Sequence, residues 1–165
     1  MQVLVSGKRL KYLLAILNSS LMDFYFPLIS TEIQGNTRRY FKQYVELCPI
    51  KDCQKDNISF ESLVDCIQFG HSHGLEYEAK TLEALVDVMV YGLYFEAEMR
   101  AAGCYINERV AEIVQPFKDT DDDEFKADYV KKLAEYCGKD SIIYAGLIHS
   151  RNVKSVQAIL KEQKE

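Results

Sequence analysis

The sequence has no tryptophan and few of the residues that interrupt regular structure, with 3 prolines and 8 glycines among 165 residues. This composition excludes a collagen-like or low-complexity chain. No uncharged apolar run approaches the roughly 18 residues that a membrane-spanning helix requires, so we do not expect an integral membrane protein. Hydrophobic residues make up 48% of the chain, and its length fits one helical domain over residues 1–165 with one core.

The sequence also has fewer basic than acidic residues. It contains 20 Lys and Arg and 25 Asp and Glu, which gives a net charge of -5. A protein that binds nucleic acid or an anionic membrane directly is expected to carry a basic patch, so neither function is expected. The acidic excess is concentrated in residues 51–118, which hold 12 acidic and 6 basic side chains. This distribution favours a protein partner with a basic surface.

The cysteines do not form the dense, even-numbered pattern of a small disulfide scaffold, since there are 5 of them without regular spacing. Cys66 and Cys137 lie at helical spacing from apolar neighbours, which predicts buried thiols. The apolar stretch 12–17 follows basic residues but is short and precedes no A-x-A cleavage site, so it is interpreted as the first helix of the mature domain. A reduced, cytoplasmic protein is therefore expected.

Apolar residues recur at steps of three and four almost everywhere, without long alternation, which predicts an all-α fold: a compact multi-helix bundle of about seven or eight helices. The segment 76–99 is apolar nearly all round between Leu85 and Phe95, so it is expected to be the central, buried helix. The other expected segments are a stripe from Leu10 to Leu21 with a break near Pro27, a helix over 40–48, a helix from Asn57 or Ser59 to Gly74, a helix over 106–117, a helix from about 119 to Gly138, and a hairpin of 141–149 and 153–161.

Three potential metal ligands, Cys66, His71 and His73, lie within eight positions of one another. A closed zinc site uses four convergent ligands, usually from two paired motifs, and the sequence has no second motif with suitable spacing. We therefore interpret these residues as polar groups at a helix end and expect no metal. A helical metal-dependent enzyme stays open as an alternative if the three side chains converge.

Motifs that mark catalytic or cofactor sites are missing from the sequence. It has no G-x-S-x-G turn, S-x-x-K run, H-E-x-x-H helix or glycine-rich phosphate loop, and its glycines are scattered singly. No catalytic residue and no cofactor are therefore predicted, and we expect a protein that acts by binding.

Tyrosine is the most distinctive component, with 11 residues, and it is favoured where one end of a side chain packs while the other meets a partner. Acidic residues gather at two predicted helix starts, 76–78 and 121–124, and the first of these also contains a tyrosine. An acidic run at a helix start also stabilises the helix dipole, and both roles can hold together. The predicted partner-binding residues are Glu76, Tyr77, Glu78, Tyr94, Asp121, Asp122, Asp123 and Glu124.

Residues 73–96 carry a resemblance to a known group of proteins. His73-Gly74-Leu75 precedes an amphipathic helix with Leu82, Leu85 and Met89, which ends in the sequence VYGLYFE. This layout resembles small helical proteins encoded beside antibacterial toxins of bacterial contact-dependent and type VI secretion systems, including immunity proteins. The resemblance implies a cytosolic protein that binds a cognate toxin and covers its active site, and it assigns no functional residue.

Residues 141–160 resemble the helix pair of one ankyrin repeat. The T-P-L-H-x-A opening and a second copy at a 33-residue period are both missing, so an ankyrin array is not expected.

The leading hypothesis is therefore an immunity or antidote protein that binds and occludes a toxin or effector domain with a basic surface. One alternative is an acidic helical adaptor or regulator, such as a secretion loading factor or an inhibitor of a nucleic-acid-binding protein. The metal-dependent enzyme is the other, and a homodimer remains open.

Overall fold

The computed structural model describes residues 7–31, 42–51, 57–117 and 122–162. Within these ranges the chain forms ten α-helices, eight of them with seven or more residues, and no strand. The predicted all-α multi-helix bundle is thus confirmed. The elements are α1 Gly7–Leu17, α2 Ser20–Ile29, α3 Lys42–Val45, α4 Asn57–Ser72, α5 Glu76–Tyr94, α6 Glu96–Ala101, α7 Asn107–Ile113, α8 Asp123–Lys139, α9 Ser141–His149, the 3-10 turn η1 Ser150–Asn152, and α10 Lys154–Glu162.

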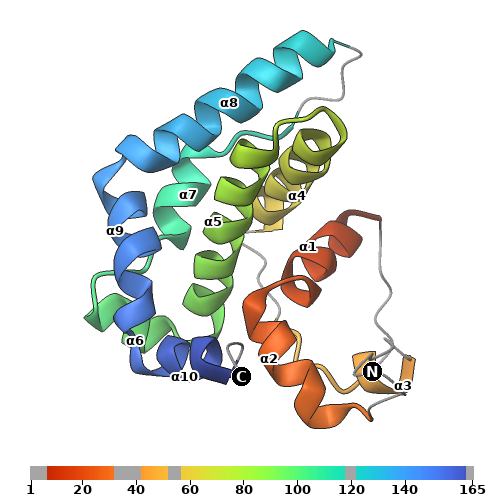
Figure 1. The fold of residues 1–165 in the computed structure, drawn as a ribbon, viewed down its shortest axis with the longest axis vertical. Coiled ribbons are helices and arrows are strands. Elements are labelled where there is room, and N and C mark those ends of the chain that lie inside the picture. The colour runs from red at the N-terminus through yellow and green to blue at the C-terminus, as the bar shows by residue number, and fades with distance from the viewer. Residues whose placement is uncertain (1–6, 32–41, 52–56, 118–121, 163–165) are drawn as a thin grey trace.

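Helix α5 lies at the centre, where it packs against α4, α8, α9 and α2 (Figure 1). Ten of its residues are buried, including an unbroken run from Val88 to Leu93, which confirms the prediction of an apolar helix covered on several sides. The helix is shorter than the expected 76–99. At Phe95 the backbone leaves helical geometry with φ -121° and ψ 38°, and α6 begins at Glu96.

The predicted break near Pro27 is wrong, because Pro27 lies inside α2 and the chain bends earlier, at Asn18 and Ser19. Ser19 caps α2: its hydroxyl accepts a hydrogen bond from the Met22 amide at 3.4 Å and donates one to the Ile16 carbonyl at 2.7 Å. Pro27 is the eighth of ten residues, so its missing N–H removes one hydrogen bond near a helix end rather than breaking a long helix.

Several predicted helix boundaries agree with the structure, and others are wrong. The helix predicted over 106–117 ends at Ile113, because Val114 is already extended, and within the described residues the helix predicted over 40–48 is only the single turn α3. Helix α4 begins at Asn57 and is followed by Gly74, whose φ of +73° suits glycine at a turn. Gly138, expected as a stop, lies within α8, which continues to Lys139. The helical hairpin near the C-terminal end is present as α9 and α10, joined by η1.

The four described cysteines, Cys48, Cys66, Cys104 and Cys137, are buried and unbridged. Burial raises the pKa of the Cys66 thiol to about 12 and that of Cys137 to about 11, so both are neutral at physiological pH. These two side chains serve as small apolar residues of the core, as their spacing predicts.

Across the described ranges, no individual helix has both the length and the apolar character to cross a membrane. Helices α1 and α2 meet the criterion of length and composition only when taken together, and they are bent by 78° relative to each other.

Candidate functional site

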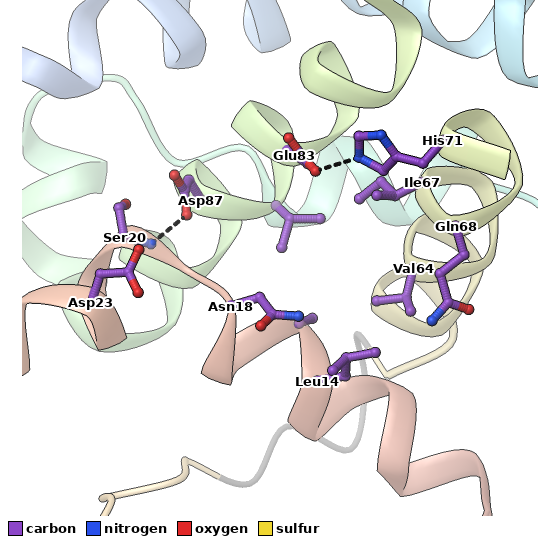
Figure 2. Close-up of a pocket in the computed structure, with 12 residues that line it drawn as sticks. Leu14, Asn18, Ser20, Asp23, Val64, Ile67, Gln68, His71, Glu83 and Asp87 are labelled. Atoms are coloured by element: carbon purple, nitrogen blue, oxygen red, sulfur yellow. Dashed lines mark hydrogen bonds and ion pairs between the residues drawn. The ribbon is translucent and has the colours of Figure 1, made fainter. Parts of the chain in front are cut away.

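A cleft of about 620 Å³ lies between the α1–α2 pair and helices α4 and α5 (Figure 2). This volume is within the range of small-ligand pockets. Its lining includes the buried side chains of Ala15, Val64 and Val86, together with several exposed polar residues. The described lining residues are Leu14, Ala15, Asn18, Ser20, Asp23, Val64, Ile67, Gln68, His71, Glu83, Val86 and Asp87.

The bend between α1 and α2 forms this cleft. Helix α1 packs against α4, whereas α2 turns away and packs against α5. The first turn of α2 is tied to α5 at two points: the Ser20 amide donates to Asp87 Oδ1 at 2.9 Å, and the Ser20 and Tyr91 hydroxyls lie 2.5 Å apart. The bend thus leaves a space between the helices, with Ser20 fixed at one end.

Three carboxylates line the cleft, Asp23, Glu83 and Asp87. Burial raises the pKa of Asp87, the charges of Asp23 and Glu83 raise it further, and hydrogen bonds from Ser20 act in the opposite direction. Burial also raises the pKa of Asp23. No Lys or Arg is found among the described residues that line the cleft. The basic residue that does line it, His71, is paired with Glu83. We call this site the acidic cleft.

His71 connects the acidic cleft to the start of α5. Its Nδ1 lies 3.0 Å from Glu76 Oε2 and its Nε2 lies 2.8 Å from Glu83 Oε1. The hydrogen bond with Glu83 is the main cause that raises the pKa of His71, with a smaller contribution from Glu76. A carboxylate of the cleft and one outside it are therefore joined through a single imidazole.

The structure brings two of the predicted acidic groups to the same end of the molecule. Glu76, Tyr77 and Glu78 form the first turn of α5, where the Tyr77 side chain is 79% exposed. Asp122, Asp123 and Glu124 are exposed at the start of α8. His73, in the turn between α4 and α5, approaches the start of α8, where its Nε2 lies 3.5 Å from Asp123 Oδ2. We call Glu76, Glu78, Asp122, Asp123 and Glu124 the acidic end; Asp121 lies outside the described residues.

Tyr94 does not join this group, because it stands at the opposite end of α5, roughly 27 Å from Glu76 along the helix axis. Its hydroxyl donates to the Pro49 carbonyl at 2.8 Å and accepts from the Lys51 amide at 3.2 Å. The side chain is half-buried and holds residues 49–51 against α5.

Cys66, His71 and His73 do not converge. Cys66 is fully buried, His71 faces Glu76 and Glu83, and the His73 ring stacks on Phe69 with 3.9 Å between ring centroids. In the part of the chain that the structure describes, no group of three or more His, Cys, Asp or Glu side chains is arranged to hold a metal ion.

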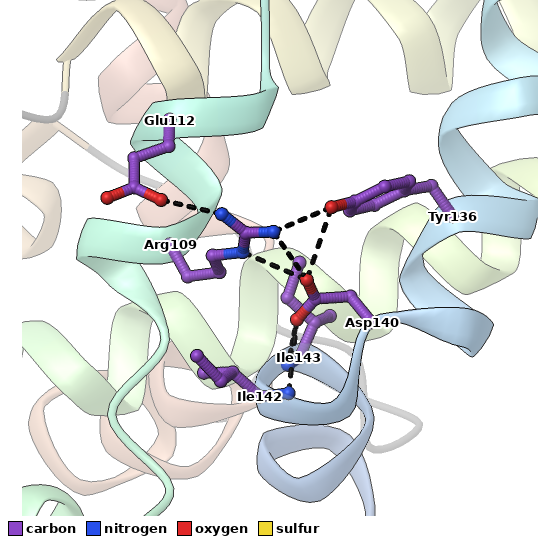
Figure 3. Close-up of polar contacts among 6 residues, drawn as sticks. All are labelled: Arg109, Glu112, Tyr136, Asp140, Ile142 and Ile143. Atoms are coloured by element: carbon purple, nitrogen blue, oxygen red, sulfur yellow. Dashed lines mark hydrogen bonds and ion pairs between the residues drawn. The ribbon is translucent and has the colours of Figure 1, made fainter.

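A second polar cluster surrounds Arg109 (Figure 3). The guanidinium donates to Asp140 Oδ2 at 2.9 Å, to the Tyr136 hydroxyl at 2.7 Å and to Glu112 at 2.7 Å. Asp140 Oδ1 accepts the amides of Ile142 and Ile143, which caps α9. Burial acts to raise the pKa of Asp140, but these hydrogen bonds and Arg109 lower it. The cluster joins α7 to the corner between α8 and α9, which is a structural role.

The carboxylates of the cleft were not among the predicted site residues. Glu76, Glu83 and Asp87 follow one another at steps of seven and four, which places them on one face of a helix, so part of this signal was present in the sequence. Asp23 belongs to another helix, and its position beside them depends on the bend at Ser19.

Comparison of the chain with protein-family models, with curated proteins and with solved structures finds no match. The function is therefore argued from the geometry and charge of the site.

Proposed function

We propose that this chain is a non-catalytic binding protein that holds a basic protein partner against the acidic cleft and the acidic end. The observation that carries the proposal is the acidic cleft itself. Asp23, Glu83 and Asp87 line a space of about 620 Å³ in which no described lining residue is Lys or Arg.

Several acidic side chains elsewhere in the molecule are paired with a Lys or Arg side chain of the protein itself. Asp65 is paired with Lys11 at 2.7 Å, Asp128 with Lys132 at 2.7 Å, and Asp140 with Arg109 at 2.8 Å. At these three positions the protein's own cations offset the negative charge. A partner that supplies cations to the cleft would do the same there, and complementary potentials speed association and select the partner.

The acidic end extends this surface beyond the cleft through His71 and Glu76. Tyr77 lies within it as a mostly exposed aromatic side chain, which suits a packed contact surrounded by charged groups. Together these residues offer both long-range attraction and a site for close packing.

We further propose that the partner is a toxin or effector domain and that the chain acts as its antidote by steric occlusion of the partner's active site. The resemblance of residues 73–96 to immunity proteins of bacterial toxin systems supports this choice. The acidic surface suits a toxin whose active site is basic, as it is when the substrate is a nucleic acid.

The test uses the product of the gene that neighbours the one encoding this chain. The two proteins are expressed together and separately, and growth of the expressing cells is followed. Light scattering then measures the mass, and hence the stoichiometry, of the purified complex. The proposal predicts a one-to-one complex and relief of growth arrest. A neighbouring product that neither binds nor is neutralised, or turnover of a small molecule by the pure chain, would overturn it.

A further inference from the structure

We propose that the acidic cleft receives one aliphatic cation, the Lys or Arg side chain of a partner polypeptide, with its charged head between Asp23 and Asp87 and its hydrocarbon stem on the apolar wall. This inference rests on the proposed function, because it identifies the group that the partner inserts.

One end of the cleft is suited to the charged head. Figure 2 shows Asp23, Ser20 and Asp87 together there, with Asp87 Oδ1 already held by the Ser20 amide at 2.9 Å. The carboxylate of Asp87 is therefore fixed in orientation before a ligand arrives. It is half-buried and lies near the like charges of Asp23 and Glu83, so an ammonium or guanidinium group would offset both the burial and the repulsion.

The rest of the cleft is suited to a hydrocarbon stem. Leu14, Val64 and Ile67 lie across the cleft from the two aspartates (Figure 2). Lys and Arg side chains bury their methylene groups against such surfaces while the head remains with polar groups. A small hydrated metal ion would leave this wall in contact with water, and an anion would be repelled by all three carboxylates.

The surroundings of the cleft favour a side chain of a polypeptide over a free polyamine. His71 links the cleft to Glu76 of the acidic end, which lies outside the cavity and whose side chains are exposed except for the half-buried Glu78. A polypeptide with further basic residues can occupy both regions, whereas a small polyamine fills only the cleft. Lys80 lies on the same face of α5, between Glu76 and Glu83 in sequence. It does not line the cleft, so it does not take the place proposed for the partner's cation.

The experiment titrates the isotope-labelled protein with capped five-residue peptides and follows backbone amide resonances by NMR. The peptides are glycine with a central lysine, arginine, norleucine or citrulline, and spermidine and putrescine form a separate arm. The lysine and arginine peptides should cause saturable shifts at Ser20, Asp23 and Asp87 with roughly millimolar affinity, whereas norleucine and citrulline should not.

The variants Asp23→Asn and Asp87→Asn, alone and together, remove charge but keep side-chain shape and the acceptor for the Ser20 amide. The double variant should weaken binding of the lysine peptide by about tenfold or more. Asp128→Asn serves as the matched control, because this exposed residue is on α8 and pairs with Lys132; it should leave binding unchanged. The dispersion of the same spectra shows that each variant is folded.

Two results would overturn the inference. The first is that no cation shifts the amide resonances of residues 20, 23 and 87, or that the shifts are equally large in the double variant. The second is binding of spermidine or putrescine at least about tenfold tighter than either basic peptide, which would assign the cleft to a free polyamine. Since no partner protein is used, failure here leaves the one-to-one complex of the proposed function to be judged by its own test.

Discussion

At the scale of single residues, Asp140 combines two structural roles. It is 8% exposed, caps α9 through two backbone amides and binds Arg109 of α7. A residue that satisfies helix-end amides and a guanidinium at once cannot be replaced by a small apolar one without leaving several donors unpaired.

We predict that Asp140→Ala lowers the free energy of unfolding by about 2 kcal/mol, because both the helix cap and the ion pair are lost. Asp140→Asn should lower it less, since its side-chain oxygen still accepts the Ile142 and Ile143 amides. Urea denaturation measures both values. Glu112→Ala is the control, because Glu112 binds Arg109 from an exposed position and should change stability by less than about 0.5 kcal/mol.

Asp87 leads to a prediction on pH. Its pKa is raised in the folded protein, so folding favours the protonated acid, and this contribution to stability is lost as pH rises through the folded pKa. Asp87→Asn should therefore have a Tm equal to or above that of the wild type at pH 7. The difference should vanish near pH 3, below the unfolded pKa of about 3.9. A variant that is clearly less stable than the wild type at pH 7 would show that the charge of Asp87 stabilises the fold.

At the scale of helices, the close approach of α9 to the segment before α7 depends on Gly146. A Cβ atom added there would lie 2.3 Å from Ile106 Cγ2, and Ile106 is fully buried. An added methyl group would therefore force Ile106 or α9 to shift within a densely packed interior.

Gly146→Ala should consequently destabilise the protein by about 1–3 kcal/mol through overpacking. The matched substitution is Gly138→Ala in α8, where an added Cβ meets nothing within 4 Å. There the gain in helix propensity should stabilise the protein by about 0.5–1 kcal/mol. Thermal unfolding of both variants measures the two effects; equal effects of the two substitutions would contradict this interpretation of the packing at α9.

Helix identity followed from the sequence because apolar spacing is local information, and α5 and the α9–α10 pair were predicted within a few residues. The predicted break at Pro27 was wrong for two reasons. Ser19 caps a new helix, so the chain bends there instead, and Pro27 is tolerated because it lies close to the end of that helix. The buried Asn107 illustrates the limit. Its amide donates to the Met89 carbonyl at 3.1 Å, and its Oδ1 would lie 2.5 Å from a Cβ added at Gly92. This contact between two helices is not encoded by spacing.

Only those parts of the candidate site that lie within one short sequence segment were predicted. Acidic helix starts at Glu76 and Asp122 are visible in the sequence, and the structure places both at one end of the molecule. The acidic cleft depends on four helices and one bend, so Asp23 and Asp87 could not be paired from spacing alone. Tyr94 was grouped with the acidic residues by sequence proximity, although the length of α5 separates them.

At the scale of the whole molecule, the charge distribution should control how fast a partner arrives. Asp123→Lys with Glu124→Lys should slow association with the neighbouring-gene product and flatten its dependence on salt. Asp122 is left unchanged because it caps α8 by accepting the Phe125 amide at 3.0 Å, and its loss would cost about 1 kcal/mol of stability. Stopped-flow kinetics at several salt concentrations measure the effect. Unchanged rates would exclude the start of α8 from the encounter surface.

The most direct measurement of the central claim is the calorimetric affinity of the neighbouring-gene product for the wild-type chain and for Asp23→Asn combined with Asp87→Asn. The account predicts one-to-one binding to the wild type and a dissociation constant raised by about tenfold or more in the double variant. Binding of equal strength to both proteins, or no binding to either, would contradict it.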